Sequence, residues 1–323
     1  MHARSILRLG SHFRAERDSV IHAKLTQVEK RGLLFAFLGV FLFSLSLPMT
    51  KWALESFDPY FTSTGRAVIA AVLAAVILKV RRAPRFKREH LRSFIYTALG
   101  AAFGWPILIA LALDRPHSTS AKIAVIAAIM PLMTALLAVL RTHERVSRSF
   151  WFASAAGSAI LVLFALSRTD GTPRDLIADG LTVIAVIASS WCYVEGAGLT
   201  KEYPGWQVIS WVVIISLPLN LPISIWLWSR THASHTYTWH GVVGLVIIGV
   251  SSMYLGFFAW YKGLNEAGTA RGGQVQQLQA LMTLGWSALL LHEHVTLVTL
   301  LSAIGVVLCV IWALTARKPL PSN

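Results

Sequence analysis

The sequence predicts an all-α polytopic membrane protein, with ten transmembrane helices arranged as two inverted five-helix repeats. Three observations lead to this fold class: an apolar composition, ten apolar blocks of membrane-spanning length, and an internal repeat. Of the 323 residues, 55% are hydrophobic and only 14% are charged, against about 25% charged residues in typical soluble domains. Together with a mean hydropathy of +0.60, this composition excludes an ordinary soluble enzyme, a disordered chain and a coiled coil.

Ten apolar blocks follow one another along the chain. A bilayer core roughly 30 Å thick is crossed by about 20 residues in a helix. A backbone in lipid must satisfy its own hydrogen bonds, so each block predicts a helix. Turn-forming residues mark the gaps, as at Asp58-Pro59 and Tyr203-Pro204-Gly205. The blocks cover residues 32–50, 59–79, 93–113, 119–140, 149–167, 179–199, 207–228, 239–261, 268–291 and 295–315.

The basic residues indicate how these helices are oriented. The net charge is +14, and most Lys and Arg side chains fall in residues 1–31, in the segment 79–92 and in other loops on the same side. The positive-inside rule then places both termini in the cytoplasm, as polar tails 1–31 and 316–323 of an inner-membrane protein. A translation start assigned too early is the alternative explanation of residues 1–31. Because topology accounts for the charge, we expect a small molecule and the lipid bilayer as partners and no nucleic acid, and we leave a homodimer open.

The two halves of the chain repeat one another. At a shift of 149 residues, the segments 129–147 and 278–296 share a His-Glu-x-Val-Ser/Thr run and further identities. We therefore expect one five-helix unit at 32–167 and a second at 179–315, joined by a linker at 168–178. An odd number of helices inverts the second unit relative to the first. This arrangement is typical of transporters whose substrate site lies near the midplane, where the repeats meet.

From about residue 32 to 315, the chain resembles the EamA-like branch of the drug/metabolite transporter superfamily. The resemblance is carried by Arg66, by the stretch Gly-Gln-Val-Gln-Gln-Leu-Gln at 273–279, and by paired Glu-x-Val-Ser/Thr segments at 144–147 and 293–296. It implies a secondary transporter that works by alternating access, with export of an amino acid or related metabolite as the leading function. The alternatives are an uptake carrier, a drug efflux transporter or, from another class, a non-transporting membrane scaffold or enzyme.

The paired segments are interpreted as structural caps. Glu144 and Glu293 each precede a hydroxyl residue, Ser147 or Thr296, that is suited to begin the next helix as an N-cap. A carboxylate there also faces the positive end of the helix. Members of the family usually carry a proline in both copies of the repeat. This chain departs from that pattern, because Pro131 in the first copy corresponds to alanine in the second.

Arg66 is the first candidate for substrate binding. It lies about seven residues into a predicted span, where an arginine costs about 2.5–3.5 kcal/mol on insertion scales and usually faces a cavity or a partner. We interpret it as an anion anchor or a gate. The alternative is a side chain that snorkels to the outer interface.

Glu195 is the candidate for proton coupling, because it is the carboxylate that lies clearly within a predicted span. A carboxylate part-way into the bilayer can take up and release a proton as access alternates. The competing interpretation is structural: an ion pair with Lys201 or Arg271 at the cytoplasmic rim.

Polar and aromatic residues within spans complete the predicted substrate site. The glutamines that begin the ninth span form two pairs at helical spacing, 274/277 and 276/279, and we expect Gln276 and Gln279 to line the cavity while the other pair bonds neighbouring helices. Trp105, Trp191 and Tyr254 are expected to stack on substrate, with ordinary helix packing as the alternative.

No constellation for catalysis stands out in the sequence. His232, His235 and His240 lack a firm metal-ligand spacing and an accompanying carboxylate, Cys192 and Cys309 lie in apolar runs, and no phosphate-binding glycine loop is present. We therefore expect no enzyme, no metal and no cofactor.

Overall fold

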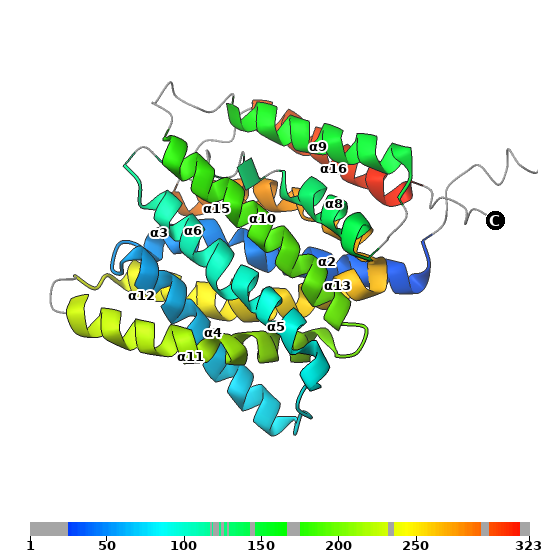
Figure 1. The fold of residues 1–323 in the computed structure, drawn as a ribbon. Helices are drawn as coiled ribbons and strands as arrows, with labels where there is room; N and C mark the ends of the chain where they lie inside the picture. Colours follow the sequence, from blue (N-terminus) through cyan, green and yellow to red (C-terminus); the bar gives the residue numbers. More distant parts are fainter. Residues whose placement is uncertain are drawn as a thin grey trace, which may run out of the picture.

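Every regular element in the described part of the chain is a helix, which confirms the all-α prediction (Figure 1). The structure is a computed structural model, and it describes residues 25–116, 118, 123, 126–127, 129–142, 146–166, 175–231, 236–291 and 297–316. Six of its helical stretches are long and apolar enough to cross a membrane, and three shorter apolar helices accompany them. The six are Gln27–Ala53, Pro59–Val80, Arg88–Leu113, Leu176–Leu199, Gly205–Arg230 and Trp239–Ala267.

The helices follow the predicted blocks closely. In the first half they are α2 (Gln27–Ser44), α3 (Ser46–Ala53), α4 (Pro59–Val80), η1 (Arg88–His90), α5 (Leu91–Ala98), η2 (Leu99–Gly104), α6 (Trp105–Leu113), α8 (Met130–Thr142) and α9 (Arg148–Leu166). In the second half they are α10 (Leu176–Leu199), α11 (Gly205–Thr231), α12 (Trp239–Ile247), η4 (Ile248–Leu255), α13 (Gly256–Ala267), α14 (Thr269–Gln274), α15 (Gln277–Leu291) and α16 (Leu297–Thr315).

Two blocks differ from the prediction. The block 119–140 is described as a continuous helix only from Met130, because most of residues 119–128 lies outside the described residues. The block 268–291 is not one helix: α14 ends at Gln274, and α15 begins at Gln277 after a turn. The side-chain directions of residues 268–291 therefore cannot be derived from one continuous helix, because the turn interrupts the helix between α14 and α15.

Side-chain caps determine where several helices begin. Thr26 accepts a hydrogen bond from the backbone N–H of Glu29 while the Glu29 carboxylate accepts from Thr26, a complete capping box for α2. Asp58 caps α4, whose first residue is Pro59, and Asp175 caps α10. Each such cap stabilises its helix by about 1 kcal/mol, because it satisfies backbone donors that have no partner in the first turn.

The helices pack in pairs that lie far apart in the sequence. α2 packs against α13, α4 against α11, and α9 against α16, while α10 packs against α5, α6 and α8 (Figure 1). Small residues allow the closest approach: a Cβ placed on Gly263 of α13 would lie 2.4 Å from the backbone nitrogen of Ala36 in α2. Such small-residue contacts are typical of helix packing in lipid, where van der Waals contact drives association.

Two π-helical segments interrupt long helices. η2 separates α5 from α6, and η4 separates α12 from α13. Segments of this kind are rare and frequently lie at functional sites, because the extra residue re-aims side chains. In η2, Gly100 is pressed against α10, where an added Cβ would lie 2.4 Å from the Ala188 carbonyl oxygen and 2.5 Å from Cys192 Cβ.

This contact predicts that Gly100→Ala destabilises the protein by about 1–3 kcal/mol, the usual cost of overpacking a tight interior. Thermal unfolding of the purified full-length protein in detergent, followed by tryptophan fluorescence, measures the effect. The matched control is Gly198→Ala in α10, where an added Cβ meets nothing within 4 Å. Equal melting temperatures for the two variants would contradict the close approach of η2 to α10.

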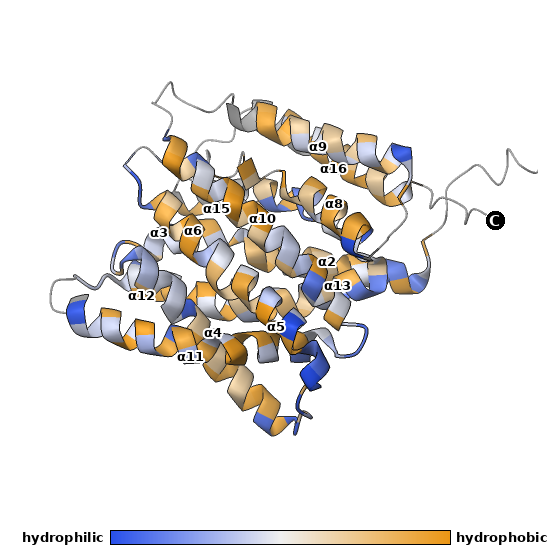
Figure 2. Ribbon diagram, viewed as in Figure 1, coloured by the Kyte–Doolittle hydropathy of each residue, from blue (hydrophilic) through white to orange (hydrophobic). Residues whose placement is uncertain are grey.

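Hydrophilic residues gather toward the two ends of the helix bundle, while the middles of the helices are mostly apolar (Figure 2). The end where α2 begins and α13 ends carries five of the ion pairs among the described residues: Arg31–Glu266 at 2.9 Å, Lys87–Glu89 at 3.7 Å, Lys87–Glu202 at 3.1 Å, Arg141–Glu195 at 2.7 Å and Arg271–Glu29 at 3.4 Å. At the opposite end Arg115 donates to Asp175 at 2.6 Å, and this hydrogen bond holds the pKa of the Asp175 carboxyl below its usual value.

Candidate functional site

Two adjoining cavities lie between the helices, and they share the lining residues Trp105, Met130 and Gln279. The first, which we name the arginine cavity, holds about 360 Å³ of space not filled by atoms. Its lining residues are Phe43, Ser46, Arg66, Ala101, Trp105, Met130, Ser189, Tyr193, Ser252, Phe257 and Gln279. It is therefore built from both halves of the chain.

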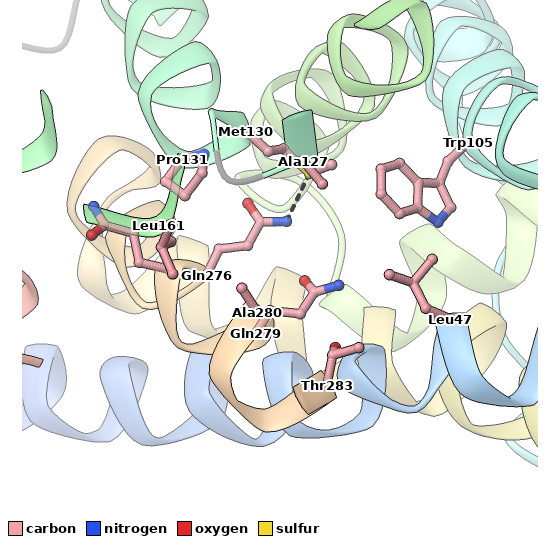
Figure 3. Close-up of a pocket in the computed structure, with 11 residues that line it drawn as sticks. Leu47, Trp105, Ala127, Met130, Pro131, Leu161, Gln276, Gln279, Ala280 and Thr283 are labelled. Carbon is pink, nitrogen blue, oxygen red and sulfur yellow. Dashed lines mark hydrogen bonds between the residues drawn. The ribbon is translucent and has the colours of Figure 1, made fainter. Parts of the chain in front are cut away.

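The second, the glutamine cavity, holds about 400 Å³ and is lined mainly by α8, α15 and the turn between α14 and α15. Figure 3 shows the amide groups of Gln276 and Gln279 directed into it, with Trp105 on the opposite side. Its lining residues are Leu47, Trp105, Ala127, Met130, Pro131, Leu161, Gln276, Gln277, Gln279, Ala280 and Thr283. Polar amides thus face an otherwise apolar wall, a combination typical of small-molecule sites.

Arg66 is 4% exposed, so its guanidinium does not snorkel to an interface. Nη2 donates a hydrogen bond to the Ser252 hydroxyl at 2.8 Å, while the buried Nε has no hydrogen-bond partner. None of the ion pairs among the described residues involves Arg66. A buried charge is normally paired, because removing an ion from water costs several kcal/mol. The guanidinium therefore presents an uncompensated positive charge to the cavity.

The fold brings Ser252 to Arg66 through a tight contact between α4 and η4. A Cβ on Gly249 would lie 2.8 Å from Ile69 Cγ2 and 3.2 Å from the Arg66 carbonyl oxygen, so only glycine allows this approach. Three residues later in η4, Ser252 donates to the Ile248 carbonyl and accepts from Arg66. Nothing in the sequence pattern singled out Ser252, because its role depends on the π-helical register of η4.

The glutamines lie where the long ninth segment is broken. Gln276 lies in the turn itself, donates from Nε2 to Met130 Sδ at 2.9 Å, and has an unpartnered Oε1. Gln279 lines both cavities, also with an unpartnered Oε1. Gln277 donates to Gln274 at 2.7 Å and also borders the glutamine cavity. The structure thus places the 276/279 pair on the cavity, but because of the broken helix rather than a continuous helical face.

The predicted aromatic residues separate into one that lines the cavities and two that do not. Trp105, at the start of α6 directly after η2, lines both cavities. Trp191 is 37% exposed and lines neither cavity, so its contact with substrate stays a prediction that these two cavities do not support. Tyr254 is buried outside both cavities, where its hydroxyl pairs with Ser210 Oγ at 2.7 Å, so it packs in the helix core. Tyr193, which no sequence pattern marked, lines the arginine cavity instead.

Glu195 lies in neither cavity. Its carboxylate is 4% exposed and accepts a hydrogen bond from Arg141 Nε at 2.7 Å. The partner is therefore Arg141, and not Lys201 or Arg271 as the structural interpretation assumed. Arg271 instead contacts Glu29 and donates to the Ala316 carbonyl at 2.8 Å. Because Arg141 lies in the last turn of α8 and Glu195 belongs to α10, the ion pair joins these two helices.

Of the predicted caps, only Ser147 lies within the described residues. Its hydroxyl accepts a hydrogen bond from the backbone N–H of Phe150 at 3.2 Å, in the first turn of α9. Glu144, Glu293 and Thr296 lie outside the described residues. Within the described ranges, no group of three or more His, Cys, Asp or Glu side chains is placed to hold a metal ion.

Comparison with known proteins gives three findings. The model of the EamA-like transporter family matches the chain twice, over residues 30–166 and 176–315. The uncharacterized transporter YdeK of Bacillus subtilis (strain 168) is 38% identical over 283 residues, which cover 86% of this chain and 95% of that protein. A chain of a solved crystal structure, only 13% identical, superposes with a TM-score of 0.69 over 87% of this chain and 97% of that one, and so shares the fold.

Proposed function

Because this chain belongs to the EamA-like transporter family and is a multi-pass membrane transporter, we propose that it moves a small metabolite across an inner membrane by alternating access. The observation that carries the proposal is Arg66: a buried, uncompensated guanidinium in a cavity between the two halves of the chain. An anionic group of the substrate would supply the missing counter-charge. Export of an amino acid or a related metabolite is the leading form of this activity.

The cavity chemistry supports a substrate that is polar at both ends. The arginine cavity offers a planar cation next to the Ser252 hydroxyl, a geometry suited to a carboxylate. The adjoining glutamine cavity offers carbonyl oxygens of Gln276 and Gln279 that have no donor. Unpaired buried acceptors cost free energy, so a substrate that donates hydrogen bonds there is favoured over one that does not. Trp105, which borders both cavities, would contact the apolar part between the two ends.

We also propose ten membrane spans in two inverted repeats, on the basis of how the helices pair. In the order of helices, α10 of the second half corresponds to α2 of the first, and α13 corresponds to the α5–α6 stretch. The contact of α2 with α13 therefore has an equivalent in the contact of α10 with α5 and α6. The contacts α4–α11 and α9–α16 each join a helix to its own counterpart, as a two-fold relation between the halves requires. The π-helical segments begin 149 residues apart, at Leu99 and Ile248. The two separate family matches fit the same division. Alternating access would then exchange the conformations of the two halves.

The proposed orientation places both termini in the cytoplasm. The bundle end where α2 begins and α13 ends carries the basic segment 81–92 together with Arg141, Lys201 and Arg271. The positive-inside rule assigns such an end to the cytoplasm.

A substrate panel tests the function directly. Purified protein reconstituted into vesicles is expected to exchange amino acids or related carboxylates across the membrane, and a proton gradient is expected to change the rate. Flux that is faster out of vesicles loaded to represent the cytoplasm supports export, and the reverse supports uptake. If bulky organic cations are transported and carboxylates are not, the protein is a drug efflux transporter. No flux of any panel member from well-folded protein would favour a scaffold or an enzyme.

A further inference from the structure

The segment 81–92, which we name the basic turn, lies at the bundle end and runs from the end of α4 through η1 into the first residues of α5. It carries six arginine and lysine residues, and these side chains are exposed: Arg81, Arg82, Arg85, Lys87, Arg88 and Arg92. Glu89 lies within the same turn and Glu202 on the loop beside it, and both carboxylates pair with Lys87, at 3.7 and 3.1 Å. Arg82, Arg85 and Arg88 have no ion pair among the described residues.

The basic turn is fixed to the helices rather than held only at its ends. The Tyr203 hydroxyl accepts a hydrogen bond from the Lys87 backbone N–H at 3.0 Å, and Gln207 Nε2 donates to the Pro84 carbonyl at 3.0 Å. The Phe86 ring packs against Phe94 and Trp211, with centroids 4.9 and 5.4 Å away. The exposed arginines are thus presented from a rigid base, so that little ordering entropy is lost when they bind a partner.

Arg82 occupies a position where glycine would be the less strained residue. Its φ is +48°, the left-handed conformation that ends α4, and the Ala83 N–H completes the turn by donating to the Leu78 carbonyl at 3.0 Å. Glycine adopts this conformation without a steric penalty, whereas residues with a Cβ atom adopt it only at a cost in free energy. A strained residue that persists at an exposed site points to a role for its side chain. Here the side chain adds one more unpaired positive charge.

We propose that the basic turn binds the headgroups of anionic phospholipids, an interaction separate from substrate transport. Its position supports a lipid rather than a soluble partner, because the basic turn connects the end of α4 to the start of α5, where one spanning helix leaves the hydrocarbon and the next enters it. Arg81 stacks on Trp206 at 5.1 Å, and tryptophan is enriched at this membrane depth. Juxtamembrane basic clusters attract anionic lipid, and each basic residue near the surface strengthens binding about fivefold.

The test is native mass spectrometry of the full-length protein taken from mixed micelles with equal amounts of dioleoyl phosphatidylglycerol and dioleoyl phosphatidylcholine. Wild type is expected to retain phosphatidylglycerol preferentially, and 1 M salt, which shortens the Debye length to about 3 Å, should remove the preference. Arg82→Gly is expected to lower the bound ratio about fivefold without lowering the melting temperature, because glycine suits the backbone there. The double variant R85Q/R88Q should lower the ratio about 25-fold if the two contributions add.

The matched control is K51Q/R230Q, which removes the same charge from exposed residues at the opposite end of the bundle. It should keep the wild-type ratio. If R85Q/R88Q binds the two lipids in the wild-type ratio, or if the control loses as much as R85Q/R88Q, the proposal is wrong. If the partner of the basic turn is an acidic protein rather than a lipid, R85Q/R88Q is expected to bind the two lipids in the wild-type ratio.

Discussion

Arg66→Ala is expected to reduce the initial rate of substrate flux about 10- to 100-fold. A hydrogen bond to a charged group contributes about 1.5–3 kcal/mol, and alanine removes both the charge and the donors that face the cavity. Arg66→Lys should keep part of the activity, because lysine keeps the charge but not the planar fork of donors. The measurement is flux of the best substrate from the panel, in vesicles that contain equal amounts of folded protein.

Stability separates a binding role of Arg66 from a structural one. Its guanidinium is buried without a carboxylate partner, so replacement by an apolar side chain of similar length relieves a desolvation cost. Arg66→Met is therefore expected to keep or raise the melting temperature while transport is lost, a trade-off typical of functional sites. The control is Arg230→Ala, an exposed arginine near the end of α11, which should change neither property. Wild-type flux in a folded Arg66→Ala protein would leave Arg66 without a role in substrate binding.

Glu195→Gln is expected to abolish the dependence of flux on the pH gradient while substrate binding is retained. The ion pair between Glu195 and Arg141 joins the last turn of α8 to α10, and the first residue of the same helix α8, Met130, lines both cavities. Protonation of the carboxylate would break this pair and release Arg141 to water, which its 54% exposed side chain already reaches. Glutamine mimics the permanently protonated acid, so the gradient would no longer act on this contact. Flux at equal and unequal pH across the vesicle membrane measures the effect.

The matched control for this experiment is Glu266→Gln. Glu266 also pairs with an arginine at the same end of the bundle, at 2.9 Å, but this pair joins α2 to α13. The control should keep gradient-driven accumulation. If the Glu195 variant is merely less stable and still accumulates substrate as wild type does, the ion pair with Arg141 is only structural. Wild-type accumulation in both variants would thus decide against a coupling role for Glu195.

The positions of the helices could be predicted from the sequence, because they depend on local properties. Burial in lipid requires long apolar runs with internally bonded backbones, and these runs are visible in the sequence. Residues such as Asp58 and Asp175 cap helices within three residues of themselves, so the helix starts are also local. Arg66 stood out for a similar reason, since a charge within an apolar run is costly wherever the helix faces.

The faces of the helices could not be predicted, because in a membrane the outer surface is as apolar as the core. Trp191 was assigned to the substrate site on its position within a span, yet it faces outward at 37% exposure. Tyr254 is buried, but against Ser210 rather than in a cavity. In a soluble protein, the polar face of a helix shows which side chains point to solvent and which point to the core. A helix in lipid has no such polar face, so the sequence could not separate the outward-facing Trp191 from the buried Tyr254.

By itself, the sequence determined the all-helical membrane fold, the family resemblance and the unusual placement of Arg66, since each depends on residue types and short spacings. Only the tertiary structure decided that Ser252 meets Arg66, that Arg141 rather than Lys201 pairs with Glu195, and that a broken helix aims Gln276 and Gln279 into the cavity. These contacts join residues that are up to 186 positions apart. They depend on glycine-sized gaps and π-helical turns that set the rotation of each helix, and such rotations are determined by packing against neighbours rather than by the local sequence.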